Sequence, residues 1–223
     1  MREIVNGIFT WPWFSEPHGY NFNGHFIKHP GGNLCVDPVE PSDEELAEIE
    51  RQGVARILIT NRNHSRAANK IRARTGARTL IHPADAAHAR KEGAQLDGEL
   101  NPGDKIGPFV VIDAPGKSLG EVVLHWPDRR ILLVGDAVVG DPPGKCKLLP
   151  DKVVDDPPRL RDSARQLLAL DFDILLVGDG VPILARAKER LRNWWRRFSS
   201  RASAEDDFGP PPSIRASNLT LIM

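Results

Sequence analysis

The sequence predicts an α/β protein in which mixed β-sheets are covered by helices on their outer faces. Two observations support this prediction. The apolar run VARILIT at 54–60 is typical of a strand that is covered on both faces, and helical segments alternate with such runs. Elsewhere, the apolar runs EVVLHW and RRILLVGD are joined by the short turn PDRR at 127–130, which is typical of a hairpin. Parallel and antiparallel strand pairing are therefore both expected in one fold.

Turn residues divide the first half of the chain into short segments. The helix of SDEELAEIERQG carries its own boundary signals, since Ser42 and Glu45 form a capping box and Gly53 ends the helix. Further helices are predicted over about 65–75 and from Pro83. Strands are predicted over the runs 3–11, 20–29, 34–37, 54–60 and 79–82.

The second half continues with hairpin strands and ends in helices. Strands are predicted over 104–114, 121–126, 129–136 and 172–179, and helices over 158–170 and 182–198, with a proline-rich loop at about 137–158. Beyond Phe198 the chain is rich in Ser, Asp, Glu, Pro and Gly. We therefore predict one domain over 1–198 and a flexible or loosely docked C-terminal tail over 199–223.

Composition excludes several classes of protein. Lys plus Arg equal Asp plus Glu at 30 each, so no overall charge predicts a nucleic-acid or membrane partner. The two cysteines, Cys35 and Cys146, form no metal-type or redox-type pair. No apolar run approaches the ~20 residues of a spanning helix, and the N-terminal run is too short for a secretory signal. We expect a cytoplasmic protein.

Four polar or glycine-rich loops follow apolar strands, and α/β folds place ligand sites in such loops. They are TNRNHSR after Ile59, APGKSLG after Ile112, VGDAVVGD after Leu133 and VGDG after Leu176.

The order of these loops resembles the metallo-β-lactamase superfamily. That family has T-H-x-H-x-D-H after a strand, then a P-G-H-S-P-G-like turn, a G-D after the next strand and a late G-H-G. Here Thr60 opens the first motif, PGKSLGEVVLHW has the form of the second, and LLVGD and LLVGDG correspond to the last two. The resemblance covers about residues 20–185. It implies a four-layer αββα sandwich of two mixed β-sheets flanked by helices, with the site along one edge.

Six of the seven metal-ligand positions implied by this resemblance are changed. The changed positions hold Asn61, Asn63, Ser65, Arg66, Lys117 and Asp179, while Asp136 keeps the family's residue. Zinc requires imidazole, thiolate or carboxylate donors, and a charged Lys or Arg has no lone pair to donate. We therefore expect that the dinuclear zinc site does not form, and we predict no cofactor.

Charge suggests what replaces the metals. We hypothesise that Arg66 and Lys117 form a salt-bridged cluster with Asp136 and Asp179, because buried carboxylates need compensation. The predicted ligand-binding residues of this former metal cleft are Asn61, Asn63, Arg66, Lys117, Asp136 and Asp179.

Simpler roles stay open for the same residues. The asparagines and Ser65 are typical of helix caps and turns, Lys117 is equally consistent with a solvent-facing lysine, and the two aspartates with strand-end residues that bind backbone amides. His64 falls between the family's ligand positions, so we expect it to face elsewhere and to be inert.

Three classes of function remain. The prediction is a non-hydrolytic or metal-independent member of the family that binds a small polar or anionic ligand in the old cleft. The first alternative is a hydrolase of this fold with a rewired metal site, and the second is an interaction protein acting through the basic, Trp-rich helix ARAKERLRNWWRRF. Catalytic residues are not assigned, and a homodimer is left open because the family's sheet edges are exposed.

Overall fold

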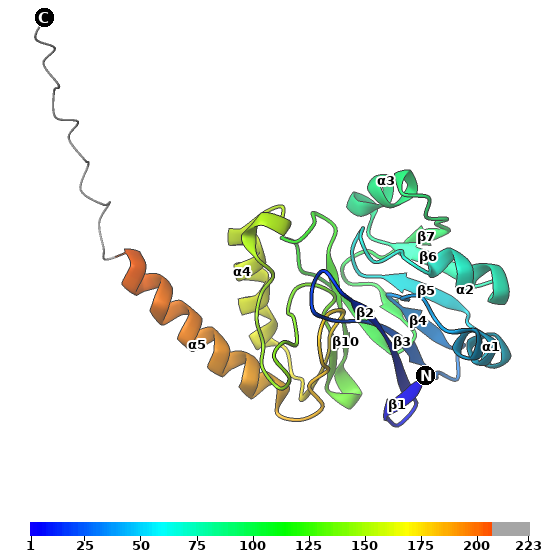
Figure 1. Ribbon diagram of the computed structural model, residues 1–223, viewed down its shortest axis with the longest axis horizontal. Coiled ribbons are helices and arrows are strands. Elements are labelled where there is room, and N and C mark those ends of the chain that lie inside the picture. Colours follow the sequence, from blue (N-terminus) through cyan, green and yellow to red (C-terminus); the bar gives the residue numbers. More distant parts are fainter. Residues whose placement is uncertain (207–223) are drawn as a thin grey trace, which may run out of the picture.

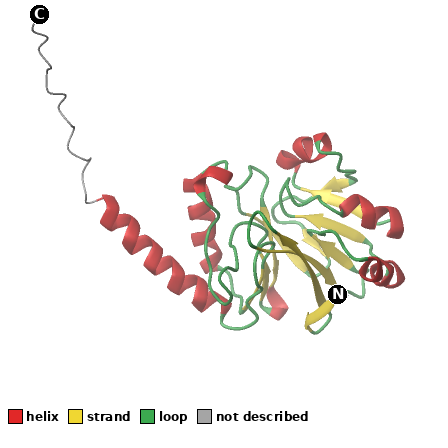
Figure 2. Ribbon diagram, viewed as in Figure 1, coloured by secondary structure: helices red, strands yellow, loops and turns green. Residues whose placement is uncertain are grey.

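Two mixed β-sheets lie face to face between two layers of helices (Figures 1 and 2). The computed structural model describes the backbone of residues 1–206 and the side chains of residues 1–199. The first sheet has the strand order β1 to β7, and the second has the order β12-β11-β10-β9-β8. This arrangement confirms the predicted αββα sandwich.

The first sheet changes from antiparallel to parallel along its length. Strands β1 to β4 pair antiparallel, whereas β4 to β7 pair parallel. Its strands are β1 Arg2–Val5, β2 Ile8–Ser15, β3 Tyr20–Ile27, β4 Leu34–Val36, β5 Arg56–Ile59, β6 Arg78–Ile81 and β7 Gly98–Glu99. The helices that follow its later strands are α1 Asp43–Gln52, α2 Ala68–Thr75 and α3 Pro83–Lys91.

The second sheet contains the predicted hairpin. Strands β10 and β11 pair antiparallel around a short 3₁₀ turn at Pro127–Arg129, and β11 pairs parallel with β12. Its strands are β8 Lys105–Ile106, β9 Phe109–Asp113, β10 Val122–Trp126, β11 Ile131–Leu133 and β12 Ile174–Leu176. It is covered by α4 Pro157–Gln166 and α5 Ala187–Asp206, and two further 3₁₀ turns lie at Asp151–Val153 and Leu167–Ala169.

The continuous apolar runs reflect strands that are buried on both faces. In β5, Ile57 and Ile59 pack with the helix layer of α1 to α3, whereas Leu58 packs between the two sheets. In β11, Leu132 contacts the layer of α4 and α5, whereas Leu133 faces the other sheet. Because successive strand residues point to opposite faces, neither face can be polar.

Helix α1 begins where the sequence predicts, whereas helix α5 begins later than predicted. The capping box of α1 is confirmed, with Ser42 Oγ accepting from Glu45 N at 3.2 Å and Glu45 Oε2 accepting from Ser42 N at 3.0 Å. Helix α5 begins at Ala187 rather than at residue 182, because Ile183 exchanges two backbone hydrogen bonds with Leu175.

Helix α5 also continues past residue 198, to Asp206. The remainder of the predicted tail, 207–223, lies outside the described residues, and the division into a domain and a tail stays a prediction. None of the helices within residues 1–206 combines the length and apolarity that crossing a membrane requires.

Leu191 packs helix α5 against the second sheet, and its removal tests this packing. Leu191 is fully buried in the layer between α5 and the second sheet, whereas Leu184 is 42% exposed. Leu191→Ala is expected to lower the free energy of unfolding by about 2–5 kcal/mol, and Leu184→Ala by about 0.5 kcal/mol or less. Chemical denaturation measures both, and equal losses would contradict this packing.

Candidate metal centre

Polar side chains gather where strands of both sheets end at one edge. Strands β4, β5, β11 and β12 end there, and β10 begins there because it runs antiparallel. The polar residues that these strand ends place at the edge, all buried, are Asp37, Thr60, Asn61, His64, Glu121, Asp136 and Asp179.

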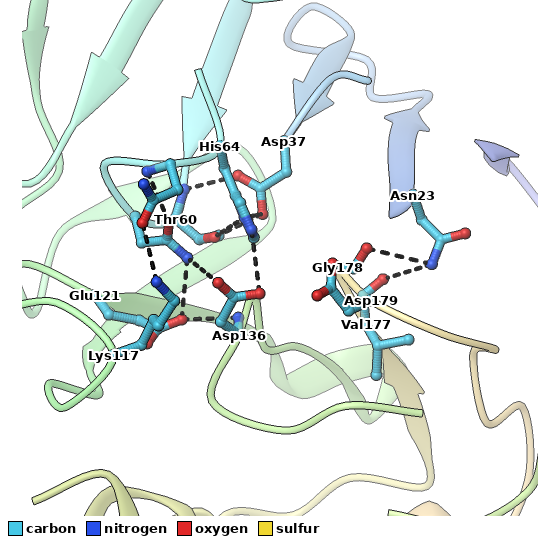
Figure 3. A network of polar contacts seen from close by, with 12 residues as sticks. Asn23, Asp37, Thr60, His64, Lys117, Glu121, Asp136, Val177, Gly178 and Asp179 are labelled. Carbon is cyan, nitrogen blue, oxygen red and sulfur yellow. Dashed lines mark hydrogen bonds and ion pairs between the residues drawn. The ribbon is translucent and has the colours of Figure 1, made fainter. Parts of the chain in front are cut away.

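His64 lies at the centre of this group and is fully buried. Its Nδ1 atom lies 3.0 Å from Asp37 Oδ2 and 3.1 Å from Thr60 Oγ1. Its Nε2 atom lies 3.2 Å from Asp136 Oδ1 on the other side of the ring (Figure 3), although the two atoms are not aligned for a hydrogen bond. The expectation that His64 faces elsewhere is therefore wrong. A tight turn, in which His64 N donates to Asn61 O at 3.0 Å, carries the ring inward.

Asp37 and Thr60 hold the imidazole from behind. Thr60 donates twice to Asp37, from its backbone N to Oδ1 at 2.8 Å and from its Oγ1 to Oδ2 at 2.6 Å. With both of its oxygens engaged, Asp37 is oriented toward His64 Nδ1. A carboxylate in this position favours a proton on Nδ1 and leaves the Nε2 lone pair available.

The glycines of the two G-D motifs allow the chain to approach this histidine closely. A Cβ atom at Gly178 would lie 2.9 Å from His64 Cε1, and one at Gly135 would lie 2.4 Å from Thr60 Oγ1. Gly135 also has a φ of +51°, which favours glycine. Each motif therefore supplies an aspartate and the space that its neighbours need.

Three donor atoms converge without hydrogen bonds, although His64 Nε2 and Asp136 Oδ1 face each other as an ion pair and Arg66 lies 3.9 Å from Asp179 Oδ1. His64 Nε2, Asp136 Oδ1 and Asp179 Oδ1 are buried and make no hydrogen bond. These three residues offer ligand atoms that all lie within 4.8 Å of one another. Unpaired buried polar atoms are costly, and one imidazole with two carboxylates is a common donor set for a divalent metal. The residues present fit a single metal ion.

The pKa values of the group reflect several buried carboxylates that share one site with His64. Burial opposes the charged form of His64, but the carboxylates of Asp136 and Asp37 outweigh this effect and raise its pKa to about 10. Burial and the charge of Asp136 raise the pKa of Asp179 to about 7, and they also raise the pKa of Glu121 well above its usual range. Burial acts in the same direction on Asp136, but the nearby His64 holds its pKa well below the usual range. Protons here occupy the place of a cation.

The predicted asparagines serve as hydrogen-bonding links. Asn61 Nδ2 donates to Asp136 Oδ2 at 3.2 Å and to Glu121 Oε1 at 3.3 Å. Its Oδ1 accepts from the backbone N of Asn63 at 2.9 Å, which is the turn-capping role left open for these residues. Asn63 Oδ1 in turn accepts from Lys117 Nζ at 3.1 Å.

The proposed salt-bridged cluster forms only in part. Arg66 lies 3.9 Å from Asp179 Oδ1 and its guanidinium lies over the Phe22 ring, 4.3 Å from the centroid. Lys117 makes no ion pair with Asp136 or Asp179 within the described part of the chain, because its ammonium group binds Asn63. The ligand-binding role of the six predicted residues stays a prediction.

Sequence reasoning missed Asp37, His64 and Glu121. Glu121 Oε1 accepts from the backbone N of Asp136 at 2.8 Å, so it positions the loop that carries this aspartate. Asp37 closes the predicted strand LCVD and Glu121 opens EVVLHW. A carboxylate at the end of a buried strand was the available signal.

Curated relatives overturn the prediction of a metal-independent, non-hydrolytic protein. A hydroxyacylglutathione hydrolase from Cereibacter sphaeroides is 31% identical over 127 residues, which are 52% of this chain and 48% of the relative. The chain thus spans about half the length of the curated relatives it matches. Their names are those of hydrolases, and the structure assembles a metal-ligand triad. The main functional prediction is therefore wrong, and its alternative of a hydrolase with a rewired metal site agrees better.

Solved structures share the fold at low identity. A metallo-β-lactamase from Pontibacter korlensis aligns with a TM-score of 0.71 at 16% identity, covering 89% of this chain and 97% of that one. TTHA1623 in a di-iron-bound form aligns with a TM-score of 0.59 at 23% identity, covering 81% and 98%. The prediction of no cofactor, with zinc not expected, is contradicted by the candidate metal-ligand triad together with the hydrolase relatives.

A family model matches most of the chain and identifies its family. The family model described as the metallo-β-lactamase superfamily matches residues 4–196. This span includes every strand except the first two residues of β1, and every residue of the triad. The chain belongs to the metallo-β-lactamase superfamily.

Proposed function

We propose that this protein is a metal-dependent hydrolase whose metal is held by His64, Asp136 and Asp179. The observation that carries the proposal is the convergence of three buried donor atoms without hydrogen-bond partners. The names of the curated relatives support hydrolysis as the reaction.

The donor set constrains the kind of metal. One imidazole and two carboxylates suit Zn²⁺, Fe²⁺ or Mn²⁺ and leave a coordination position open. When bound, such a metal would lower the pKa of water or polarise a carbonyl oxygen. The substitutions at the family's other positions leave donors for one ion rather than two.

The surrounding residues have separate tasks. Asp37 retains the Nδ1 proton of His64, so that Nε2 faces Asp136 and Asp179. Arg66, at a former ligand position, carries a fixed positive charge beside Asp179 and is held by the Phe22 ring. We assign Arg66 to the stabilisation of negative charge on the carbonyl oxygen of the substrate, because its guanidinium cannot lose its proton.

The substrate class that we propose is a carboxylic ester or thioester, in which water adds to the acyl carbon and the alcohol or thiol leaves. The relatives' name supports the thioester. A cytoplasmic location also belongs to this proposal, and it agrees with the two buried free cysteines.

Metal binding is the first test. Chelator-treated protein that is then incubated with Zn²⁺, Fe²⁺ or Mn²⁺ is expected to retain about one ion per chain, as three converging ligands imply. His64→Ala should abolish retention, whereas His88→Ala, at an exposed histidine of α3, should not. Asp37→Asn should weaken affinity about 10- to 100-fold, because the ring loses its orienting carboxylate. Mass spectrometry of the metal content decides, and retention by His64→Ala would contradict the assignment.

Turnover tests the reaction and the role of Arg66. The metal-loaded protein should hydrolyse short acyl thioesters, and Arg66→Ala should lower kcat about 10²-fold or more with little change in KM, because the charge develops in the transition state. Arg66→Lys should restore part of the rate. A panel of thioesters and esters, followed by thiol or acid release, measures this. Equal rates for wild type and Arg66→Ala would contradict a role of Arg66 in the reaction.

Stability of the metal-free protein should fall as pH rises. The pKa of His64 is about 10 in the folded protein and about 6.5 when unfolded. The folded state therefore binds the proton more tightly, so this stabilisation is fully present below about pH 6.5 and is lost as pH rises toward 10. Denaturation at pH 7, 8.5 and 10 should show this loss in wild type and a flatter profile in His64→Asn. Parallel profiles would contradict the buried charge.

A further inference from the structure

A cavity apart from the candidate metal centre lies between helix α5 and the loop that follows β11. Its volume is about 490 Å³, within the range of ligand pockets. The loop lines one side and one face of α5 lines the other, and neither the triad nor its supporting residues take part. Charged and aromatic side chains in its lining include Lys145, Lys147, Arg190, Trp194 and Phe198.

The cavity carries positive charge without matching negative charge. Lys147 is ion-paired with Asp141, which neutralises both. Lys145 and Arg190 make no ion pair with any acidic residue in the described part of the chain. Arg190 is nevertheless fixed in place, since its guanidinium donates to Gly144 O at 2.7 Å. An arginine held at the wall and an exposed lysine of the same lining supply two positive charges, which suit a dianion.

The wall beside these cations is aromatic. Trp194 and Phe198 stack with ring centroids 5.1 Å apart and an interplanar angle of 23°. Arg190, Trp194 and Phe198 are spaced four residues apart, so they form one stripe along α5. Both rings are half-buried and line the cavity. A flat aromatic surface next to a guanidinium suits a ligand with both a planar ring and an anionic group.

The cavity lies close to the candidate metal centre. Lys147 Nζ lies 5.1 Å from the centroid of the Tyr20 ring. Tyr20 precedes Asn21, whose backbone O accepts from Gly180 N at 2.8 Å, so this ring lies on the strand next to the loop of Asp179. A backbone hydrogen bond also connects the cavity with the candidate metal centre. Gly140, which precedes the cavity-lining residue Asp141, donates from its N to Asp179 O at 2.9 Å.

We propose that this cavity binds an organic phosphate that carries an aromatic ring, of the nucleotide type, and that this group is the anionic arm of the hydrolysed substrate. Lys145 and Arg190 hold the phosphate, and Trp194 stacks on the ring. The second half of the proposal rests on the hydrolase function proposed above, whereas binding in the cavity does not.

Binding is measured on the chelator-treated full-length chain by calorimetry, with AMP as the probe. AMP should bind, and Lys145→Ala and Arg190→Ala should each weaken binding about tenfold or more, because a charge-assisted contact is lost. Arg192→Ala removes an exposed arginine of α5 outside the cavity and should leave affinity unchanged. Since Arg190 also binds the loop, Arg190→Lys is the second variant and should recover part of the affinity.

Adenosine and inorganic phosphate test the contributions of the phosphate and of the aromatic ring separately. Adenosine should bind at least about tenfold more weakly than AMP because it lacks the phosphate, and inorganic phosphate should be weaker because it lacks the ring. Equal effects of Arg190→Ala and Arg192→Ala, or no binding of AMP, would overturn the site. Tighter binding of glutathione than of AMP, with the same dependence on Lys145 and Arg190, would overturn the assignment of an aromatic phosphate.

Turnover distinguishes this inference from the proposed function. Arg190→Ala should raise KM for a thioester with a nucleotide arm and leave KM for a short thioester unchanged. Binding of AMP without hydrolysis of any ester or thioester would overturn the hydrolase proposal and leave the cavity as a binding site. Hydrolysis of short thioesters without AMP binding would overturn the proposed phosphate site and leave the hydrolase proposal standing.

Discussion

The contact between Asp37 and His64 is the interaction on which the site depends. Four acidic side chains, those of Asp37, Glu121, Asp136 and Asp179, are buried at one edge of the sandwich. Buried carboxylates that share a site repel one another and lose hydration, so they require compensating charge or hydrogen bonds. His64 meets this requirement between Asp37 and Asp136, and its ring orientation is determined by the carboxylate behind it.

Much of the surrounding architecture follows from packing this histidine inside the fold. Asp37 takes a φ of +47° to direct its carboxylate toward Thr60 and His64, a conformation that aspartate tolerates better than most residues. Gly178 leaves room for the imidazole ring, and Gly135 leaves room for Thr60. Asn23 ties the loop of Asp179 to β3, because its side-chain amide donates to the carbonyl oxygen of Val177 at 3.1 Å (Figure 3) and to that of Gly180 at 2.9 Å. The site is therefore rigid because both sheets contribute to it.

The positions at which the family carries histidines divide into two kinds in this chain. Asn61 and Asn63 became linkers that join the loop to Asp136 and to Lys117. Arg66 and Asp179 carry charged side chains that lie beside each other, 3.9 Å apart. A centre with one divalent metal and one guanidinium would place a fixed organic cation where a dinuclear centre has its second metal ion.

The sequence by itself determined the layers of this protein but not the partners of its polar side chains. Apolar runs such as 54–60 specify doubly covered strands, and the capping box at Ser42 and Glu45 specifies a helix start, because both signals are local. The order of the four loops identified the family and therefore the edge that carries the site. Position in a motif did not predict the role of His64, because the turn closed by His64 N and Asn61 O carries the ring inward to Asp136. Asp37, Glu121 and His64 are distant in sequence and meet only when β4, β5 and β10 are placed side by side and face to face. The convergence of His64, Asp136 and Asp179 was thus decided by the tertiary structure, since donor distances depend on how the two sheets pack.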